Sequence, residues 1–293
     1  MGSSRILIAA VSTATLALAG LATSTGVANA APTTNVAAQA WAPADSAKIH
    51  PGTQMYTDGA QCTANFVFGD GSGNTYVGYA AHCAGTGAAT DTNGCDSGSL
   101  PLDTRVRFAD GGSLVSSGTT VGNGTLVYSS WLAMQQNDES DPNACAFNDF
   151  ALVQVDAADV SQVNPSMPFW GGPVGLNSDG TGVGEDVYSY GNSSLRAGVS
   201  ALSPKRGISL GTDSEGWNHP VYTATPGIPG DSGSGFLDAE GNALGVLSTV
   251  QLAPLVGSNG VGDLSRELAY AQDNSGIAGL RLELGTEPFA PAL

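Results

Sequence analysis

Short apolar runs, separated by clusters of Gly, Pro, Asn, Asp and Ser, recur along most of this chain of 293 residues. Runs of this length and spacing are typical of many short β-strands joined by tight turns. The composition agrees with this reading, because 41 residues are Gly and only 12% are charged. The pattern therefore predicts an all-β fold of the sandwich or barrel type, not an alternating α/β fold.

Nine apolar runs are predicted to form strands. The first two flank the sequence GDGSGN at residues 69–74, which has the Gly and Asn content of a turn. The predicted strands are Cys62–Phe68, Thr75–Ala81, Thr104–Ala109, Thr119–Tyr128, Phe150–Val155, Glu185–Tyr190, Pro220–Ala224, Gly233–Leu237 and Ala243–Val250.

One stretch has the spacing of an amphipathic helix. It runs over Leu264–Gln272, and Asp263 stands before it as an N-cap. Leu264, Leu268 and Ala271 fall on one face of this helix. The sequence therefore predicts a single C-terminal helix beside the strands.

The first 30 residues have the features of a secretion signal. Arg5 is the only charge before an apolar stretch, residues 6–21, and Ala28-Asn29-Ala30 is a small-x-small cleavage pattern. A transmembrane anchor is the alternative, but the apolar stretch is short and interrupted by Ser and Thr. We expect a signal peptide over 1–30, a linker or short pro-segment over 31–50, and a folded domain over 51–293 in a secreted, extracellular protein.

The chain is strongly acidic, with 26 acidic and 9 basic residues and a formal net charge of −17. A phosphate backbone or an anionic membrane surface would repel such a chain. The sequence therefore predicts no nucleic-acid partner and no stable membrane association. We interpret the acidity as a source of solubility and expect a monomer.

The four cysteines are Cys62, Cys83, Cys95 and Cys145. An even number behind a secretion signal indicates two disulfides, and four cysteines allow three pairings. No C-x-x-C spacing is present, so no zinc site is predicted.

Two motifs contain a candidate base and the group that would orient it. His82 stands in YAAHC at the end of a predicted strand, next to Cys83. A histidine held there is suited to general-base catalysis, although a buried structural histidine is the alternative. Asp149 stands in NDFAL at the head of another strand, where a carboxylate could accept a hydrogen bond from an imidazole.

A third motif contains a candidate nucleophile. Ser232 lies in the Gly-rich sequence GDSGSG, which begins at Gly230. Glycines let such a loop expose a hydroxyl while its backbone N–H groups point into one concavity that can bind an oxyanion. A plain hairpin turn is the alternative.

The three motifs occur in the order His, Asp, Ser, separated by 67 and 83 residues. Together they resemble the active-site motifs of the chymotrypsin/trypsin superfamily of serine peptidases, in particular its secreted bacterial members. The resemblance covers roughly residues 53–272. It implies that His82 is the base, Asp149 orients it and Ser232 is the nucleophile, with the N–H groups of Gly230 and Ser232 forming the oxyanion hole.

The resemblance also implies a fold. It implies two antiparallel six-stranded β-barrels with the active site between them and a boundary near residues 160–180. It further implies a Cys62–Cys83 disulfide and, with it, a Cys95–Cys145 disulfide.

The sequence GNALGVLSTV resembles the strand that lines the substrate cleft of the family. The resemblance assigns substrate binding to Ser248, Thr249 and Val250, with Ser248 beneath the catalytic residues. The branched Val250 would narrow the specificity pocket, and residues 223–229 contain no acid that would select Arg or Lys. A small or medium apolar residue is therefore the expected preference.

Asp231 precedes the nucleophile and is expected to fix the loop by pairing with a cation or with backbone N–H groups. The digestive members of the family supply a new N-terminal amine after a β-branched residue and Gly-Gly, and no such start is found near residues 49–52. Arg196 and Arg206 are therefore the expected partners.

These features predict a serine endopeptidase that acts on polypeptides without a metal or an organic cofactor. The sequences GDGSGN at 69–74 and DTNGCDSG at 91–98 could suggest calcium loops, but they lack EF-hand spacing and are interpreted as turns. A catalytically silent, peptide-binding relative is one alternative. An esterase or lipase is another, although its triad runs in the order Ser, acid, His.

Overall fold

The computed structural model describes residues 39–87, 92–251 and 256–291, except for the side chains of Val250 and Gln251. All of these residues belong to one unit of contacts, Val36–Leu293. The signal peptide predicted over 1–30 lies outside the described residues.

The described residues are mainly β-structure, with three α-helices. No helix among them is both long and apolar enough to cross a bilayer. The strands are β1 Gln54–Thr57, β2 Ala60–Thr63, β3 Val67–Gly69, β4 Thr75–Tyr79, β5 Arg105–Asp110, β6 Thr119–Ser129, β7 Ala151–Val155, β8 Val183–Tyr190, β9 Pro204–Leu210, β10 Asn218–Thr223, β11 Gly235–Leu237, β12 Ala243–Gln251, β13 Ser258–Asp263 and β14 Arg281–Leu282. The helices are α1 Ser130–Gln136, α2 Pro142–Phe147 and α3 Leu264–Asn274.

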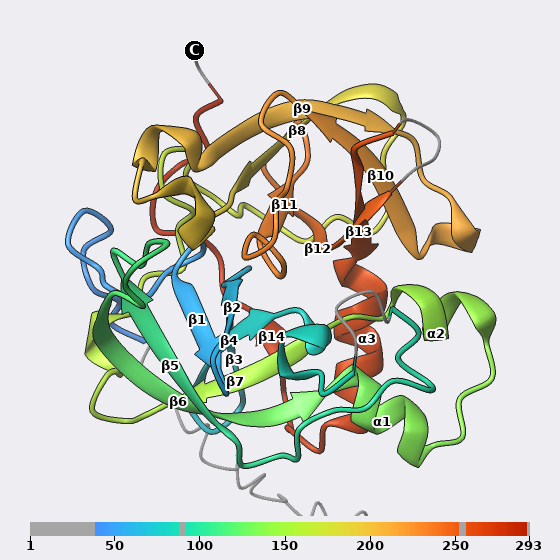
Figure 1. The fold of residues 1–293 in the computed structure, drawn as a ribbon, viewed down its shortest axis with the longest axis horizontal. Helices are drawn as coiled ribbons and strands as arrows, with labels where there is room; N and C mark the ends of the chain where they lie inside the picture. Colours follow the sequence, from blue (N-terminus) through green and yellow to red (C-terminus); the bar gives the residue numbers. More distant parts are fainter. Residues whose placement is uncertain (1–38, 88–91, 252–255, 292–293) are drawn as a thin grey trace, which may run out of the picture. The chain divides into compact units, whose positions relative to one another are not determined.

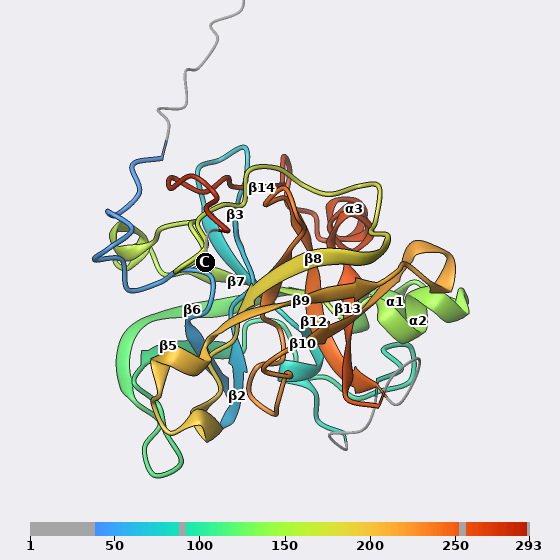
Figure 2. The same cartoon turned by 90° about the horizontal axis from the view of Figure 1, so that it is seen from above.

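The second half of the chain forms a closed six-stranded barrel with the order β10-β13-β12-β11-β8-β9 (Figures 1 and 2). Every neighbouring pair in it is antiparallel. Its interior is filled by a small apolar cluster contributed by alternating strand positions, which consists of Val187, Val221, Phe236, Leu244, Leu247 and Val261. The prediction of a six-stranded antiparallel barrel is confirmed for this half.

The first half forms an eight-stranded sheet with the order β14-β3-β4-β7-β6-β5-β1-β2. The prediction of a second closed, six-stranded barrel is not confirmed here, because no described strand pair joins β2 to β3. The predicted strand Cys62–Phe68 is interrupted at residues 64–66. Backbone N–H groups there donate to two different parts of the chain, that of Ala64 to the Thr53 carbonyl and that of Asn65 to the Gly78 carbonyl. The chain therefore bends between β2 and β3.

Four strands and two helices are absent from the sequence prediction, namely β1, β9, β13, β14, α1 and α2. β13 has the sequence SNGVGD, which is typical of a turn, yet all six of its residues are buried. α2 is only six residues long, begins at Pro142 and is capped by the Asp141 carboxylate. Such elements are stabilised by their tertiary surroundings more than by their own sequence pattern.

The N-terminal part of the described chain packs against the loop that follows β7. The Ala42 N–H donates to the Val163 carbonyl at 2.9 Å, and Ile49 is fully buried and bridged to Val163. A division at residue 50 would therefore cut through a packed segment. The position of the linker or pro-segment stays a prediction.

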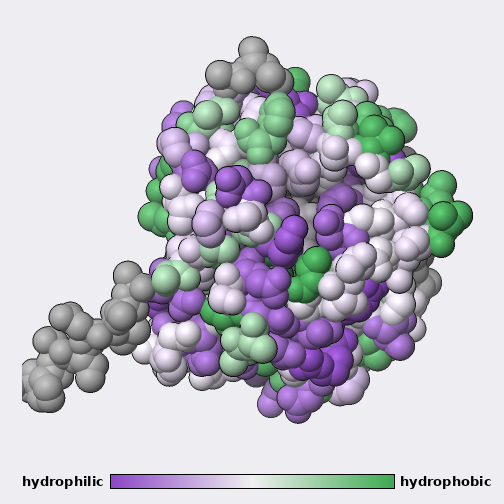
Figure 3. Space-filling model, turned by 90° about the vertical axis from the view of Figure 1, so that its left-hand side faces the viewer, coloured by the Kyte–Doolittle hydropathy of each residue, from purple (hydrophilic) through white to green (hydrophobic). Residues whose placement is uncertain are grey.

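Figure 3 shows how hydrophilic and hydrophobic residues are distributed on one face of the molecule, while the interpretation of the acidity as a source of solubility stays a prediction. On the face shown in Figure 3, hydrophilic residues surround scattered hydrophobic ones. Isolated apolar side chains of this kind are normal on soluble proteins.

Two disulfides link the first half of the chain, Cys62–Cys83 and Cys95–Cys145, with sequence separations of 21 and 50 residues. These are the pairings that the resemblance implies. Cys62–Cys83 ties β2 to the short helix that follows β4. Cys95–Cys145 ties the loop ahead of β5 to α2.

Removing the longer-range disulfide should cost more stability, because it closes the longer loop in the unfolded chain. On loop entropy alone, we expect a loss of about 4 kcal/mol for Cys95→Ser/Cys145→Ser and about 3 kcal/mol for Cys62→Ser/Cys83→Ser. Urea unfolding of both double variants beside the parent chain measures these losses. A Cys95→Ser/Cys145→Ser variant as stable as the parent would contradict the expectation.

Candidate active site

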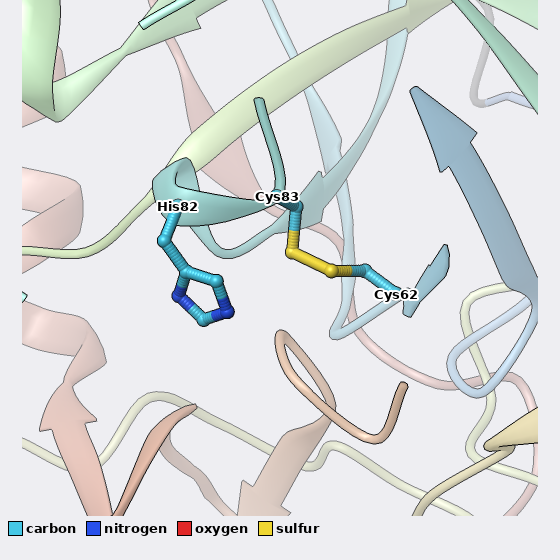
Figure 4. A group of neighbouring side chains, drawn as sticks. All are labelled: Cys62, His82 and Cys83. Carbon is cyan, nitrogen blue, oxygen red and sulfur yellow. A yellow bond between two sulfur atoms is a disulfide. The ribbon is translucent and has the colours of Figure 1, made fainter. Parts of the chain in front are cut away.

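His82 lies at the point where β4 gives way to a short 3-10 helix, Ala81–Ala84. Its neighbour Cys83 is bonded to Cys62, so the helix is held to β2 beside the imidazole (Figure 4). The His82 side chain is 25% exposed, which leaves one edge of the ring accessible. The sequence prediction of an imidazole fixed by a disulfide matches this arrangement.

A ring nitrogen of His82 and the sulfurs of Cys62 and Cys83 lie within 4.8 Å of one another. Such a group could suggest a metal site. Both sulfurs are bonded to each other, however, and a metal would need thiolates. The disulfide therefore makes this group a poor metal ligand set.

Asp149 lies just ahead of β7 and is almost completely buried, with 4% of its side chain exposed. Its Oδ2 atom accepts hydrogen bonds from His82 Nδ1 and from the Ser248 hydroxyl, both at 2.6 Å. Its Oδ1 atom accepts one from the His82 backbone N–H at 2.8 Å. Both carboxylate oxygens are therefore satisfied, and the ring of His82 is fixed with Nδ1 toward Asp149.

These contacts shift the pKa values of His82 and Asp149 in opposite directions, as a general base and the acid that orients it require. Burial favours the neutral imidazole, but the charge of Asp149 and its hydrogen bond outweigh this effect and raise the pKa of His82. Burial likewise favours a neutral Asp149, but His82 and the hydrogen bonds from His82 and Ser248 lower the pKa of its carboxyl. Asp149 is therefore ionised when His82 is neutral.

Ser232 lies in the loop between β10 and β11 and is half-buried. Gly230 and Gly233 flank it with φ values of 95° and 86°, in the left-handed region that favours glycine. A Cβ atom on Gly233 would come within 2.8 Å of the Thr63 carbonyl oxygen and the Ala80 nitrogen. The loop therefore packs closely against the first half of the chain, next to His82.

The Ser232 loop presents two backbone N–H groups that have no acceptor within the described part of the chain, those of Gly230 and Ser232. The preceding carbonyls explain their direction. The Pro229 carbonyl accepts from the Ser193 hydroxyl at 2.5 Å, and the Asp231 carbonyl accepts from the Ser234 N–H at 3.0 Å. In a trans peptide the N–H points away from the C=O, so each donor points away from the group that its peptide carbonyl contacts. The assignment of these two N–H groups to an oxyanion hole stays a prediction.

His82 and Ser232 line the same cavity, which has a volume of about 600 Å³. No hydrogen bond joins the two side chains in the described structure. Catalytic hydrogen bonds often tighten only when substrate binds. The cavity therefore brings the predicted base and nucleophile together without closing the contact between them.

The other described residues that line the cavity carry no charge. Ser248 and Thr249 of β12 line it, whereas the side chain of Val250 lies outside the described residues. Asn259 of β13 also lines it, and its Oδ1 accepts a hydrogen bond from the Gly227 N–H at 2.8 Å. The remaining described lining residues are Ala60, Gln61, Cys62, Cys83, Gly85, Gly87, Thr92, Trp131, Gly227, Ile228, Pro229, Gly230 and Leu247.

Asp231, next to Ser232, is fully buried and pairs with two cations. Arg196 Nη2 lies 2.5 Å and Lys205 Nζ 2.9 Å from Asp231 Oδ2. The expectation of Arg196 as a partner agrees with this geometry, and that of Arg206 is wrong. Arg206 faces outward on β9 and pairs with the exposed Asp186 at 3.0 Å, because alternation along the strand turns Lys205 inward instead.

Two buried charged residues of this region are absent from the sequence prediction. Lys205 could not be predicted from the usual pattern of apolar residues inward and polar residues outward. Strand β9 inverts this pattern, since Ile208 faces outward, 43% exposed, and Lys205 faces inward. Glu267 on α3 accepts a hydrogen bond from the Asp149 N–H at 3.1 Å. A signal for Glu267 exists, since it falls between Leu264 and Leu268 on the apolar face of the helix.

In the turn at residues 69–74, the carboxylate of Asp70 is satisfied by nearby residues. Asp70 accepts hydrogen bonds from the backbone N–H groups of Ser72 and Asn74, the Asn74 amide and the Tyr76 hydroxyl. Burial opposes ionisation of Asp70, but these donors lower its pKa. The carboxylate is thus occupied by the turn, as its interpretation as turn chemistry expects.

Neither a family model nor a curated protein matches the chain. Among solved structures, it is similar to Thermobifida fusca protease A, with 18% identity, a TM-score of 0.49 and coverage of 81% of this chain and 99% of that one. It is similar to a Nocardiopsis protease, with 19% identity, a TM-score of 0.45 and coverage of 80% and 98%. It is also similar to a glutamic acid specific serine protease, with 18% identity, a TM-score of 0.44 and coverage of 75% and 96%.

Removing the Asp231 carboxylate should destabilise the fold strongly, because two buried cations would lose their partner. We expect Asp231→Asn to lower the free energy of unfolding by about 3–5 kcal/mol. Asp186→Asn is the matched control, since it breaks the exposed pair with Arg206 and should cost less than about 1 kcal/mol. Equal losses for the two variants in urea unfolding would contradict the buried ion group.

Proposed function

We propose that the chain is a secreted serine endopeptidase of the chymotrypsin/trypsin superfamily. The observation that carries the proposal is the geometry around one cavity. An Asp149–His82 pair and Ser232 line or flank it, and the loop of Ser232 presents two N–H groups that have no acceptor among the described residues. This set contains a base, its orienting acid, a nucleophile and an oxyanion site.

In the proposed reaction, Ser232 Oγ attacks the carbonyl carbon of a peptide bond while His82 Nε2 takes the hydroxyl proton. The negative oxygen of the tetrahedral intermediate binds the N–H groups of Gly230 and Ser232. His82 then donates its proton to the leaving amine, and the C–N bond breaks to leave an acyl-enzyme. Water, activated by His82, hydrolyses the ester and restores Ser232. Asp149 stays ionised throughout and stabilises the imidazolium.

The substrates in this proposal are polypeptides. His82 is the only titratable side chain among the described residues that line the cavity. An uncharged side chain at the cleavage position fits such a lining better than Arg, Lys, Asp or Glu, because a buried charge would find no partner of opposite charge among the described lining residues. The expected preference for a small or medium apolar residue stays a prediction, as do the monomeric state and the extracellular location.

A catalytically silent peptide-binding protein is the second candidate. The observation that favours it is the lack of a hydrogen bond between His82 and Ser232 in the described structure. A serine without that contact is a weak nucleophile unless substrate binding closes the gap.

A serine-directed fluorophosphonate should distinguish the two candidates. We expect it to modify Ser232 of the parent chain, and expect Ser232→Ala to abolish both the labelling and peptide cleavage. His82→Ala should slow labelling by at least about 10³-fold, because the hydroxyl then lacks its base. Peptide mapping by mass spectrometry locates the label. A folded parent chain that stays unlabelled, or a label on another residue, would favour the silent binding protein.

A further inference from the structure

Glu267 is a buried acid that the proposed reaction does not use. It lies in the first turn of α3, is 0% exposed, and reaches from that helix toward the segment ahead of β7. Its Oε1 atom accepts a hydrogen bond from the Asp149 backbone N–H at 3.1 Å. Glu267 therefore touches the backbone of the residue whose side chain orients His82.

The carboxyl group of Glu267 is closely packed. A Cβ atom on Gly262 would lie 2.5 Å from Glu267 Oε1 and 2.9 Å from the Phe147 carbonyl oxygen. Its second oxygen, Oε2, is buried without a hydrogen-bond partner in the described structure. The group is thus held by steric fit and by one backbone donor.

Among the described residues, the charged and titratable groups that act on Glu267 include no cation. They are Asp149 ahead of β7, Asp263 at the end of β13 and Tyr128 on β6. The two nearby imidazoles face other acids, since His82 pairs with Asp149 and His219 pairs with Asp263 at 2.9 Å. No described ion pair involves Glu267.

An ionised Glu267 would be a buried carboxylate beside a second carboxylate, with no cation to offset it. Such an arrangement costs far more than a neutral carboxyl with one unsatisfied oxygen. Burial, followed by the charges of Asp149 and Asp263, raises the pKa of Glu267 well above its ordinary value, against the opposing hydrogen bond from the Asp149 N–H.

We propose that Glu267 is a positioning residue that, as an uncharged carboxylic acid, holds the Asp149 backbone without adding a negative charge beneath the His82–Asp149 pair. Its role toward catalysis rests on the proposed peptidase function. Its protonation state does not, and can be tested on the folded chain whatever that chain does.

The first test is the pH dependence of stability of Glu267→Gln, which keeps the shape and the acceptor but cannot ionise. In the parent chain, Glu267 stays protonated when folded and ionises when unfolded above about pH 4.5. The unfolded state then binds fewer protons, so the parent loses stability as the pH rises. The folding constant of the variant relative to the parent should therefore grow by up to about tenfold per pH unit above pH 5, until folded Glu267 ionises.

Glu240→Gln is the matched control, because Glu240 is exposed. Its folding constant relative to the parent should show no such rise. If Glu267→Gln gives the same flat profile as Glu240→Gln between about pH 5 and 8, Glu267 is ionised in the folded chain and the proposal is wrong.

The second test measures peptide cleavage. Glu267→Gln should keep kcat/KM within about threefold and leave its acidic limb in place, because no charge is removed near His82. Glu267→Leu, which offers no acceptor to the Asp149 N–H, should lower kcat about tenfold or more while changing KM less. An acidic limb that falls by about one pH unit in Glu267→Gln would show that a negative charge was lost, and an unchanged kcat in Glu267→Leu would exclude the positioning role.

Failure of the proposed function looks different from failure of this proposal. A chain without peptidase activity would still show the stability profile of an uncharged Glu267. A flat profile in an active peptidase would overturn only the role of Glu267.

Discussion

The buried carboxylate of Asp149 is the constraint around which this site is arranged. An isolated charge in such a place would cost several kcal/mol, so its oxygens must be satisfied by donors. The donors come from separate parts of the fold, namely the short helix of His82 and the Ser248 hydroxyl of β12. β12 belongs to the closed barrel and His82 to the preceding sheet, so this one group ties the two halves together where the proposed chemistry takes place.

A second buried carboxylate, that of Asp231, fixes the loop that contains Ser232. Asp231 is neutralised by Arg196 and Lys205, and it also accepts the Ser193 N–H at 3.0 Å and the Ile228 N–H at 3.2 Å. Burial lowers the pKa of Lys205, and the charge of Asp231 opposes this effect. These contacts fix the loop ahead of Ser232, in which the N–H groups of Gly230 and Ser232 have no acceptor among the described residues.

The sequence predicts which residues meet at the cavity better than it predicts how those residues are supported. Three short motifs contain His82, Asp149 and Ser232, and few functions other than nucleophilic catalysis combine these residue types. Most of the predicted apolar runs form strands. Lys205 and Glu267 were not predicted as buried, because each is a charged residue on the inward face of its element. Only their tertiary partners explain why they are buried there. The sequence of β13 is typical of a turn, yet the strand is buried because it lies between β10 and β12 in the barrel and pairs with both. The bend at residues 64–66, which separates β2 from β3 in the first sheet, is encoded by no local pattern.

The most direct test of the central claim is a crystal structure of the protein with a peptidyl phosphonate bound covalently to Ser232. The proposed mechanism predicts that one phosphonyl oxygen lies about 2.7–3.1 Å from the backbone nitrogens of both Gly230 and Ser232. It also predicts that His82 keeps its bond to Asp149. An unmodified Ser232, or a phosphonyl oxygen that contacts neither N–H group, would contradict the assignment of this cavity as an acyl-transfer site.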